Sequence, residues 1–237
     1  MLDKSKTYLI VGLGLLGGKY AQVLSQKGYR VTGITHSQST LDYALSHDYI
    51  CAGKTEDFAD LVIKADCVIF GLYPTVLLDW VREYGDLLQP GTMVTDVSGV
   101  KRGVVEPIQE MLPEGVEFIA SHPMAGRETS GIAHSAEVDF APANFIITPT
   151  ACNTQAGIDW CRDLAETLGF KRISELTPAE HDHMIGYVSQ LCHAIAVSLM
   201  CTNALLDMRK KLVEDDREGL EEMFRLSTQR REAFDKR

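Results

Sequence analysis

The sequence predicts an α/β fold: a Rossmann-type, doubly wound, mostly parallel sheet followed by a small all-α domain. Up to about residue 175, apolar runs of strand length alternate with helical patterns, and a glycine-rich turn follows the first of these runs. Beyond that point the pattern is helical throughout. We therefore expect a sheet domain at residues 1–175 and a helical domain at residues 176–237.

The elements of the first domain follow one another in a regular order. The expected strands are residues 8–11, 30–34, 66–70, 93–96, 117–120, 145–148 and 171–174. The expected helices are residues 15–27, 39–46, 76–88, 104–111 and 155–168, the third of them opened by Pro74. This alternation places helices on both faces of one mostly parallel sheet.

The second domain begins at a clear helix-start signal. Thr177 fits an N-cap, Pro178 the first helical position and Glu180 the acid of a capping box. Only Gly186 interrupts the helical pattern up to residue 206, and residues 207–237 have the apolar spacing of an amphipathic helix. Few helices remain in the chain to cover these apolar faces, so we expect a homodimer.

Composition narrows the class of protein. The chain has 237 residues, 45% of them hydrophobic, and a net charge of −10, which disfavours nucleic-acid and anionic-membrane partners. The six cysteines form no C-x-x-C pair, so we expect no metal site and buried free thiols in a reducing cytosol. The sequence shows no signal segment and no apolar run long enough to span a bilayer, which predicts a cytoplasmic protein without membrane contact.

A Gly-x-Gly-x-x-Gly motif follows the first expected strand. Gly12, Gly14 and Gly17, with Leu15 and Leu16 between the last two, open the first helix. Glycines there permit a tight turn and close approach of the backbone to a pyrophosphate, while the helix N-terminus attracts phosphate. The alternative is a glycine-rich turn without nucleotide. The position of the motif within a βαβ unit favours NAD(P) binding.

The end of the second strand bears on the choice of cofactor. NAD-binding folds normally place an acid there to bind the ribose 2′-hydroxyl. This chain has Thr35, His36 and Ser37 instead, and its next acid, Asp42, falls within the following helix. These side chains could hydrogen-bond a 2′-phosphate that no carboxylate repels, so we expect NADP in preference to NAD. The alternative is NAD bound without the acid.

Two groups of residues are candidates for the chemistry. His122 precedes a proline, and we expect it after a strand at the carboxyl edge of the sheet, together with segment 96–101. The alternative for His122 is a surface turn residue. On the long helix, a polar stripe with α-helical spacing is formed by Asp182, Gly186, Ser189 and His193. That stripe could line a pocket or pack against another helix.

Four segments together resemble the prephenate/arogenate dehydrogenase family. They are Gly-Leu-Gly-Leu-Leu-Gly-Gly at 12–18, Thr-Asp-Val-Ser-Gly-Val-Lys at 95–101, Ser-His-Pro-Met-Ala-Gly-Arg-Glu at 121–128, and Glu-His-Asp at 180–182 followed by Ser189 and His193. The His-Pro-Met-Ala-Gly segment is the most specific, and the resemblance covers residues 8 to about 205.

The resemblance implies a definite reaction. The family converts prephenate to 4-hydroxyphenylpyruvate, or arogenate to tyrosine, by oxidative decarboxylation with hydride transfer to NAD(P)⁺, in tyrosine biosynthesis. It implies that His122 is the catalytic acid/base for the ring hydroxyl and that His193 contacts the side-chain carboxylate. A serine of the family falls at Gly99 here, because this chain has the order Ser-Gly. The remaining implied substrate residues are Ser98, Gly99, Glu128 and Ser189.

The chain departs from the family after residue 204. The family continues through several helices that form a dimer and supply an arginine to the substrate, whereas here positions 201–204 lead almost directly to Leu212. We therefore expect an internally shortened helical domain. The candidate replacements for the arginine are Arg209, Arg217, Arg225 and Arg230. Two alternatives follow: a nucleotide-binding regulatory or partner protein without catalysis, and a β-hydroxy-acid dehydrogenase, which the His122 segment disfavours.

Overall fold

The computed structural model describes residues 1–126 and 129–214, with most side chains beyond residue 202 outside that description. The chain divides into two compact units, Met1–His183 and Met184–Arg237. This boundary falls later than residue 175, because the first turns of α7 (Pro178–Ile185) belong to the sheet unit, where the His181 side chain is fully buried.

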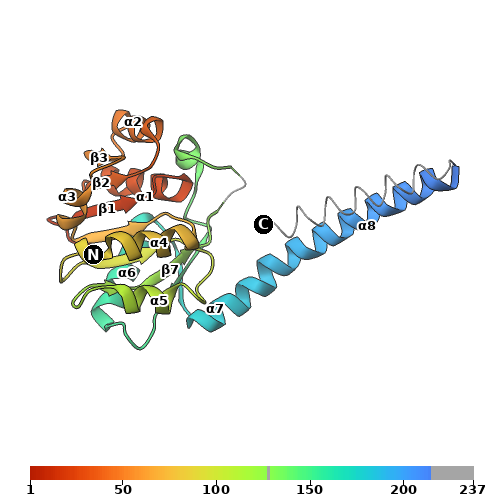
Figure 1. Ribbon diagram of the computed structural model, residues 1–237. Helices are drawn as coiled ribbons and strands as arrows, with labels where there is room; N and C mark the ends of the chain where they lie inside the picture. The colour runs from red at the N-terminus through yellow and green to blue at the C-terminus, as the bar shows by residue number, and fades with distance from the viewer. Residues whose placement is uncertain (127–128, 215–237) are drawn as a thin grey trace. The chain divides into compact units, whose positions relative to one another are not determined.

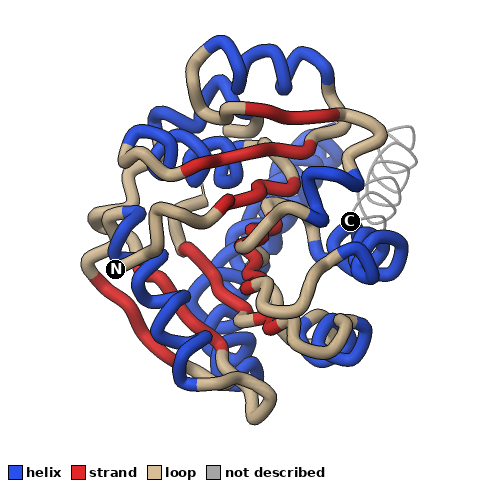
Figure 2. The backbone as a smooth tube through the Cα atoms, turned by 90° about the vertical axis from the view of Figure 1, so that its left-hand side faces the viewer, coloured by secondary structure: helices blue, strands red, loops and turns tan. Residues whose placement is uncertain are grey.

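The first unit is built on the expected parallel sheet (Figures 1 and 2). Its strand order is β3-β2-β1-β4-β5-β6, and the neighbouring strands are parallel. The strands are β1 (Thr7–Val11), β2 (Arg30–Ile34), β3 (Ala52–Lys54), β4 (Cys67–Phe70), β5 (Met93–Asp96) and β6 (Glu117–Phe118). This is the strand order of dinucleotide-binding folds, in which ligands bind where the order reverses, between β1 and β4.

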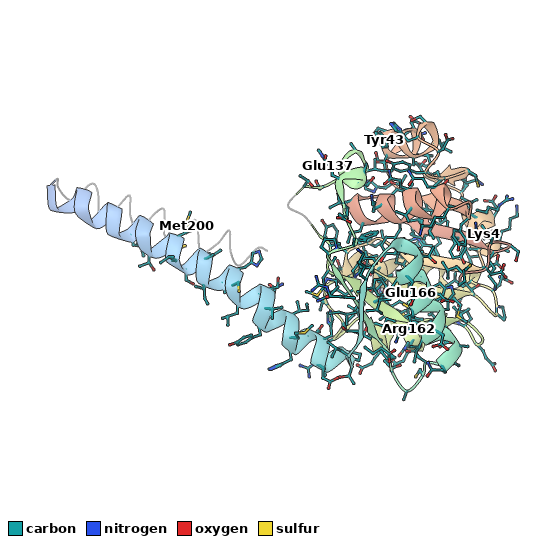
Figure 3. All side chains as sticks on the ribbon, turned by 180° about the vertical axis from the view of Figure 1, so that it is seen from behind. Lys4, Tyr43, Glu137, Arg162, Glu166 and Met200 are labelled. Atoms are coloured by element: carbon teal, nitrogen blue, oxygen red, sulfur yellow. The ribbon has the colours of Figure 1, made fainter. Side chains whose placement is uncertain are left out.

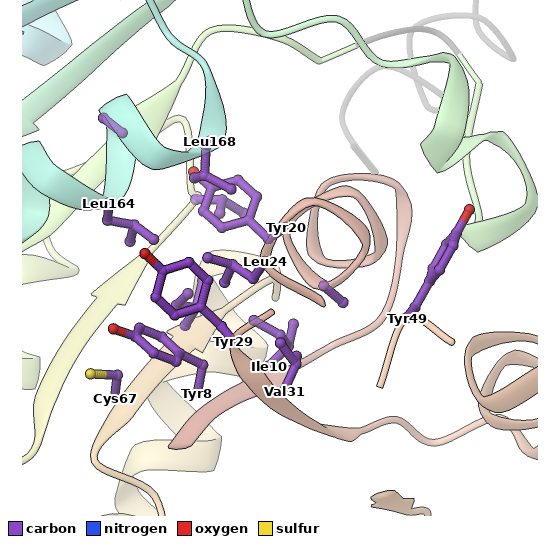
Figure 4. Close-up of a cluster of buried hydrophobic side chains, with 14 of the residues drawn as sticks. Tyr8, Ile10, Tyr20, Leu24, Tyr29, Val31, Tyr49, Cys67, Leu164 and Leu168 are labelled. Carbon is purple, nitrogen blue, oxygen red and sulfur yellow. The ribbon is translucent and has the colours of Figure 1, made fainter. Parts of the chain in front are cut away.

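Helices cover both faces of this sheet and create an apolar cluster on each. The helices of one face are α1 (Leu15–Gln26), α2 (Gln38–Ser46) and α6 (Gln155–Leu168), and those of the other are α3 (Ala59–Ile63), α4 (Pro74–Tyr84) and α5 (Val105–Met111). Along β1, Tyr8 and Ile10 belong to the first cluster, whereas Leu9 and Val11 belong to the second. Figure 4 shows the first cluster. In it the rings of Tyr8 and Tyr29 pack edge to face, with their centroids 5.3 Å apart.

Several short elements differ from the sequence prediction. β3 and α3 were not predicted, because Ala-Gly-Lys forms no apolar run and α3 has only five residues. The helix expected to reach residue 88 ends as α4 and continues only as a 3-10 turn, Gly85–Leu87. A second 3-10 segment, η2 (Ile132–Glu137), packs against α1.

The last expected strands form a separate sheet, so the prediction of one sheet was wrong. β7 (Ala120–Pro123) is antiparallel to β8 (Asn144–Thr148), which is parallel to β9 (Arg172–Glu175). The chain leaves the first sheet just after β6, where the Ile119 N–H still donates to Val94 O of β5 at 2.8 Å. His122 therefore lies within β7, opposite Ile146, and does not follow a strand of the first sheet.

The helical segment begins with the predicted capping box. The Glu180 N–H donates to Thr177 Oγ1 at 3.2 Å, and the Thr177 N–H donates to Glu180 Oε2 at 2.9 Å. After α7, a π-helical turn, Gly186–Gln190, precedes α8 (Leu191–Glu214). The regular α-helical spacing that predicted a single polar stripe from Asp182 to His193 does not hold across this wider turn.

One helix bears on the expectation that no apolar run reaches membrane length. Among the described residues, Pro178–Thr202 is a 25-residue helix whose most apolar window has a mean hydropathy of 1.5, which by length and composition alone could cross a bilayer. Polar residues interrupt this run, so it is not a continuous apolar stretch in the sequence. A helix that packs against another protein surface can have the same composition, and Met200 on α8 is 73% exposed (Figure 3).

The cysteines are free, but only part of the expectation of buried thiols holds. Cys67 on β4 and Cys161 on α6 are buried. The others lie nearer the surface: Cys51, Cys152 and Cys192 are exposed, and Cys201 is intermediate. Burial follows position, since Cys67 and Cys161 lie on faces turned towards the core.

Candidate active site

The glycine-rich turn between β1 and α1 has the shape that a dinucleotide requires. Gly12 has a φ of 94°, which favours glycine, and a Cβ at Gly17 would lie 1.9 Å from the Gly12 carbonyl oxygen. A Cβ at Gly14, in contrast, would meet nothing within 4 Å. Gly14 is the N-cap of α1 and caps it with no side chain. The first N–H groups of α1 and an open approach to them therefore fit a pyrophosphate.

A pocket of about 340 Å³ extends from this turn across the carboxyl ends of β1, β4 and β5. It is lined by residues 14–16, 71–74, 97–99, 126 and 129–131. Leu15 and Leu16, predicted to contact the cofactor, thus form part of its wall, as does Gly99 from the predicted substrate site. The pocket lies at the point where strand order reverses, which is the ligand site of such sheets.

The end of β2 carries the other residues predicted to bind the cofactor. Thr35 is buried, whereas His36 is exposed. The Ser37 hydroxyl caps α2 by accepting the Thr40 N–H at 3.3 Å. Asp42, the first acid after β2, lies within α2. The structure thus confirms that no carboxylate stands at the end of β2, although only His36 extends fully to the surface.

A buried ion pair connects the end of β5 to β7. Lys101 Nζ lies 2.8 Å from Asp96 Oδ2, and neither side chain is exposed. Lys101 Nζ also donates to Ser121 O at 2.6 Å, and the Ser121 N–H donates to Asp96 Oδ1 at 2.9 Å. Ser98 lines the pocket, and its hydroxyl also lies within hydrogen-bond distance of the Asp96 carboxylate and of Val100 O, so it belongs to this network too. The network holds the two sheets together beside the pocket.

His122 lies beside Gly99, one of the residues that line the pocket. A Cβ placed on Gly99 would be 3.4 Å from His122 Nε2, so this nitrogen borders the space beside Gly99. Burial, followed by the Lys101 cation and His181, lowers the pKa of His122 from 6.5 to about 4. The imidazole is therefore neutral at physiological pH, and within the described part of the chain no hydrogen bond involves its Nε2, which suits a general base.

His181 and Asp182, on α7, complete a line of hydrogen bonds that starts at His122. His122 Nδ1 lies 2.9 Å from His181 Nε2, and His181 Nδ1 lies 2.7 Å from Asp182 Oδ1. The Asp182 carboxylate accepts the backbone N–H groups of Lys101 at 2.9 Å and of Arg102 at 2.7 Å. Burial opposes ionisation of Asp182, but these hydrogen bonds outweigh it and lower the pKa of the carboxyl.

The remaining predicted substrate residues belong to the second compact unit or fall outside the described residues. His193 is on α8, exposed, with Nδ1 bonded to Ser189 O at 2.9 Å; it and Ser189 belong to the second compact unit. Glu128 lies outside the described residues, as do Arg217, Arg225 and Arg230 and the side chain of Arg209. The structure thus gathers Gly99 and the glycine turn at one pocket, and it places His122 beside Gly99.

Sequence reasoning did not assign a role to the residues that surround His122 most closely. His181 and Asp182 appeared only within a matching motif, and the Asp96–Lys101 pair only as part of another. The sequence did carry one signal for them: these charged residues stand next to apolar runs. A charge that such runs bury normally requires a partner. The contacts of His181 with His122 and of Asp182 with the Lys101 backbone span about 60 to 80 residues of sequence and could not be derived from local spacing.

Comparisons with known proteins agree with this geometry. Residues 20–174 match the family described as "Prephenate dehydrogenase, nucleotide-binding domain". Prephenate dehydrogenase of Bacillus subtilis is 30% identical over 205 residues, which are 84% of this chain and 54% of that protein. Cyclohexadienyl dehydrogenase of Zymomonas mobilis is 28% identical over 197 residues, which are 82% of this chain and 66% of that protein.

A solved structure gives the same result. The crystal structure of prephenate dehydrogenase from Aquifex aeolicus has a TM-score of 0.76 and 27% identity, and the match covers 82% of this chain and 70% of that one. This chain spans only about half to two thirds of the length of the curated relatives named above. The family match nevertheless covers most of the sheet unit, and the resemblance noted in the sequence is confirmed. The chain therefore belongs to the prephenate dehydrogenase family, by virtue of its nucleotide-binding domain.

Proposed function

We propose that this protein is an NAD(P)-dependent dehydrogenase that decarboxylates prephenate or arogenate in tyrosine biosynthesis. The observation that carries the proposal is the position of His122: its Nε2 borders Gly99, in the wall of the pocket that begins at the Gly14 turn. A base for the ring hydroxyl thus lies next to the expected site of the cofactor. The names of the relatives, prephenate and cyclohexadienyl dehydrogenases, support the same reaction class.

In the proposed reaction, the carbon that bears the ring hydroxyl loses a hydride and the ring loses its carboxylate as CO₂. NAD(P)⁺, when bound, would supply the acceptor for the hydride. His122 Nε2 accepts a hydrogen bond from the ring hydroxyl. As the hydride leaves and positive charge develops, Nε2 takes the hydroxyl proton. The electron pair of the broken carbon–carboxylate bond enters the ring and makes it aromatic. Because the His122 imidazole is neutral, Nε2 is available for this role.

The glycine turn and the N-terminus of α1 would hold the cofactor pyrophosphate, and Leu15 and Leu16 would pack beside it. For the adenosine end we propose NADP in preference to NAD. Support comes from exposed His36 and from the lack of an acid at residues 35–37. Histidine and hydroxyl groups can donate to a 2′-phosphate, whereas an acid would repel it.

We propose that His193 binds the substrate's side-chain carboxylate, with Ser189 and Glu128 nearby, and that the protein acts in the cytoplasm as a homodimer. The support for a dimer is the exposure of large apolar side chains on α8. Leu191 is 44% exposed, Ile195 57% and Leu199 63%. Such surfaces are normally covered by another subunit.

Of the two predicted substrate residues after β5, Gly99 leaves room at His122, while Ser98 contributes through the Asp96 network.

The test is a steady-state assay of the full-length chain with prephenate and arogenate, each against NAD⁺ and NADP⁺. We expect reduction of the cofactor with release of CO₂ from at least one substrate, and a lower KM for NADP⁺ than for NAD⁺. Cofactor binding without turnover of either substrate would show a non-catalytic nucleotide-binding protein instead. A lower KM for NAD⁺ would overturn the cofactor preference and leave the reaction class intact.

A further inference from the structure

The buried His181 and the partly exposed Asp182 lie in line with His122 and have no assigned role. We propose that Asp182, acting through His181, is a positioning group that holds His122 in the tautomer whose Nε2 can accept a proton. The inference rests on the proposed function, because it names what prepares His122 for its part in the reaction. It also makes a claim about the protein at rest, which can be tested without turnover.

The direction of each hydrogen bond follows from the carboxylate. Asp182 is ionised at neutral pH and can only accept, so His181 Nδ1 must carry a proton and donate it across 2.7 Å. A neutral His181 then has a bare Nε2, which accepts from His122 Nδ1 across 2.9 Å. With its proton on Nδ1, His122 presents a lone pair at Nε2. One carboxylate thus sets the tautomers of two imidazoles.

The backbone fixes the carboxylate at the start of this line. The N–H of Lys101 donates to Asp182 Oδ1, and that of Arg102 donates to Oδ2. Both oxygens are therefore held by main-chain atoms of the loop after β5, and rotation of the carboxylate would break two hydrogen bonds. His181, fully buried between Asp182 and His122, has no solvent with which to exchange partners.

The other charges near His122 do not replace this function. Lys101 and Asp96 also influence its pKa, but Lys101 Nζ is committed to Asp96 and to Ser121 O. At His122 the Lys101 cation lowers the pKa and Asp96 raises it, the effect of Lys101 being the larger. Burial lowers the pKa of His181 as well, although Asp182 opposes that shift, so both imidazoles remain neutral. If His181 served only to pack α7, it would not need hydrogen bonds to both His122 and Asp182.

The first test is nitrogen NMR of the full-length protein labelled with ¹⁵N-histidine at neutral pH. We expect a His122 signal with a protonated Nδ1 and a bare Nε2, assigned by its loss in His122→Asn. A wild-type spectrum with the proton on Nε2 would overturn the proposal. Because this readout needs no substrate, it decides the inference even if neither prephenate nor arogenate is turned over.

The second test uses a pair of substitutions at His181. His181→Leu removes the acceptor, so we expect a mixture of His122 tautomers and a kcat lower by about 10²-fold, with cofactor Kd unchanged. His181→Gln places an amide oxygen near the position of Nε2, and we expect it to restore the tautomer and most of kcat. His183→Leu, at an exposed neighbour on α7, is the matched control.

The outcomes separate positioning from packing. Recovery of both tautomer and kcat in His181→Gln supports the proposal. A Leu variant with the wild-type tautomer and kcat contradicts it, and so does a folded Gln variant that keeps the wild-type tautomer but is as slow as the Leu variant. Should the Leu variant fail to fold, the wild-type spectrum and the Gln variant still decide.

Discussion

His122 and His193 were both expected in the substrate site, yet their surroundings differ fundamentally. His122 is held on β7 by a line of contacts to α7, and its pKa is lowered to about 4. His193 is exposed on α8, where its Nδ1 bonds only to the carbonyl oxygen of Ser189, one turn earlier. One imidazole is oriented by distant parts of the chain and the other by its own helix. Because groups fixed in advance stabilise a transition state best, we expect His122 to act in the chemical step and His193 in substrate binding.

The sharpest way to break this comparison is to remove each imidazole in turn. For His122→Asn we expect kcat to fall by about 10³-fold or more, since asparagine cannot accept the proton, with cofactor Kd within twofold of wild type. For His193→Asn we expect KM for the substrate to rise about tenfold with little change in kcat. Steady-state kinetics and cofactor titration measure both. Equal losses of kcat in the two variants would contradict the distinction.

The second prediction concerns the buried network that supports His122. Lys101→Met leaves Asp96 without its partner in a fully buried site, so we expect a loss of about 3–5 kcal/mol in the free energy of unfolding. Lys54→Met is the matched control, because Lys54 pairs with Asp60 at the surface and its loss should cost less than about 1 kcal/mol. Urea unfolding measures both. Similar costs at the two sites would contradict the structural role of the network.

A smaller effect is expected from filling the space beside His122 Nε2. A methyl group at Gly99 would lie 3.4 Å from that nitrogen, an ordinary contact that needs no shift of the fold. Gly99→Ala should therefore lower kcat/KM by about tenfold, because the methyl group occupies the approach of the ring hydroxyl, while the free energy of unfolding stays within about 0.5 kcal/mol. Unchanged kcat/KM would place the substrate elsewhere.

The last prediction is a dependence of stability on pH. His122 titrates near 6.5 in the unfolded chain but near 4 in the folded protein, so the unfolded chain binds more protons between these values. His122 therefore lowers stability progressively as the pH falls from about 6.5 to about 4, and adds no penalty above that range. Urea unfolding at pH 7.5 and 5 should show a smaller drop in His122→Asn than in wild type. His181, whose pKa is also lowered, keeps part of the drop.

Much of the fold could be predicted from the sequence, because its signals are local. The strand at Arg30–Ile34 and the helix at Gln155–Leu168 coincide with their predicted ranges, since apolar spacing and caps determine them. The glycine turn was predicted for the same reason. The division into two sheets could not be predicted, because it depends on bonds from Ser121 to Asp96, two residues after Ile119 bonds to Val94 of β5.

The candidate site divides in the same way. His122 could be identified from a short motif, but its partners could not, since Asp182 reaches the backbone of Lys101 across about 80 positions of sequence. Ser98 was predicted to bind substrate from the family resemblance, although the family's serine falls at Gly99 here. The folded chain also places its hydroxyl against Asp96, a bond that the motif does not reveal.

The separation of the two sheets has a consequence for how this protein can change over time. The turn that would hold the nucleotide belongs to the six-stranded sheet, whereas the histidine that would handle the proton belongs to the three-stranded one. Substitutions beneath β7 and β8 can therefore retune acid–base behaviour while the dinucleotide cradle stays as it is. The parts of the protein that serve hydride transfer and proton transfer could then change partly independently. The buried pair Lys101–Asp96 connects the two sheets that carry them.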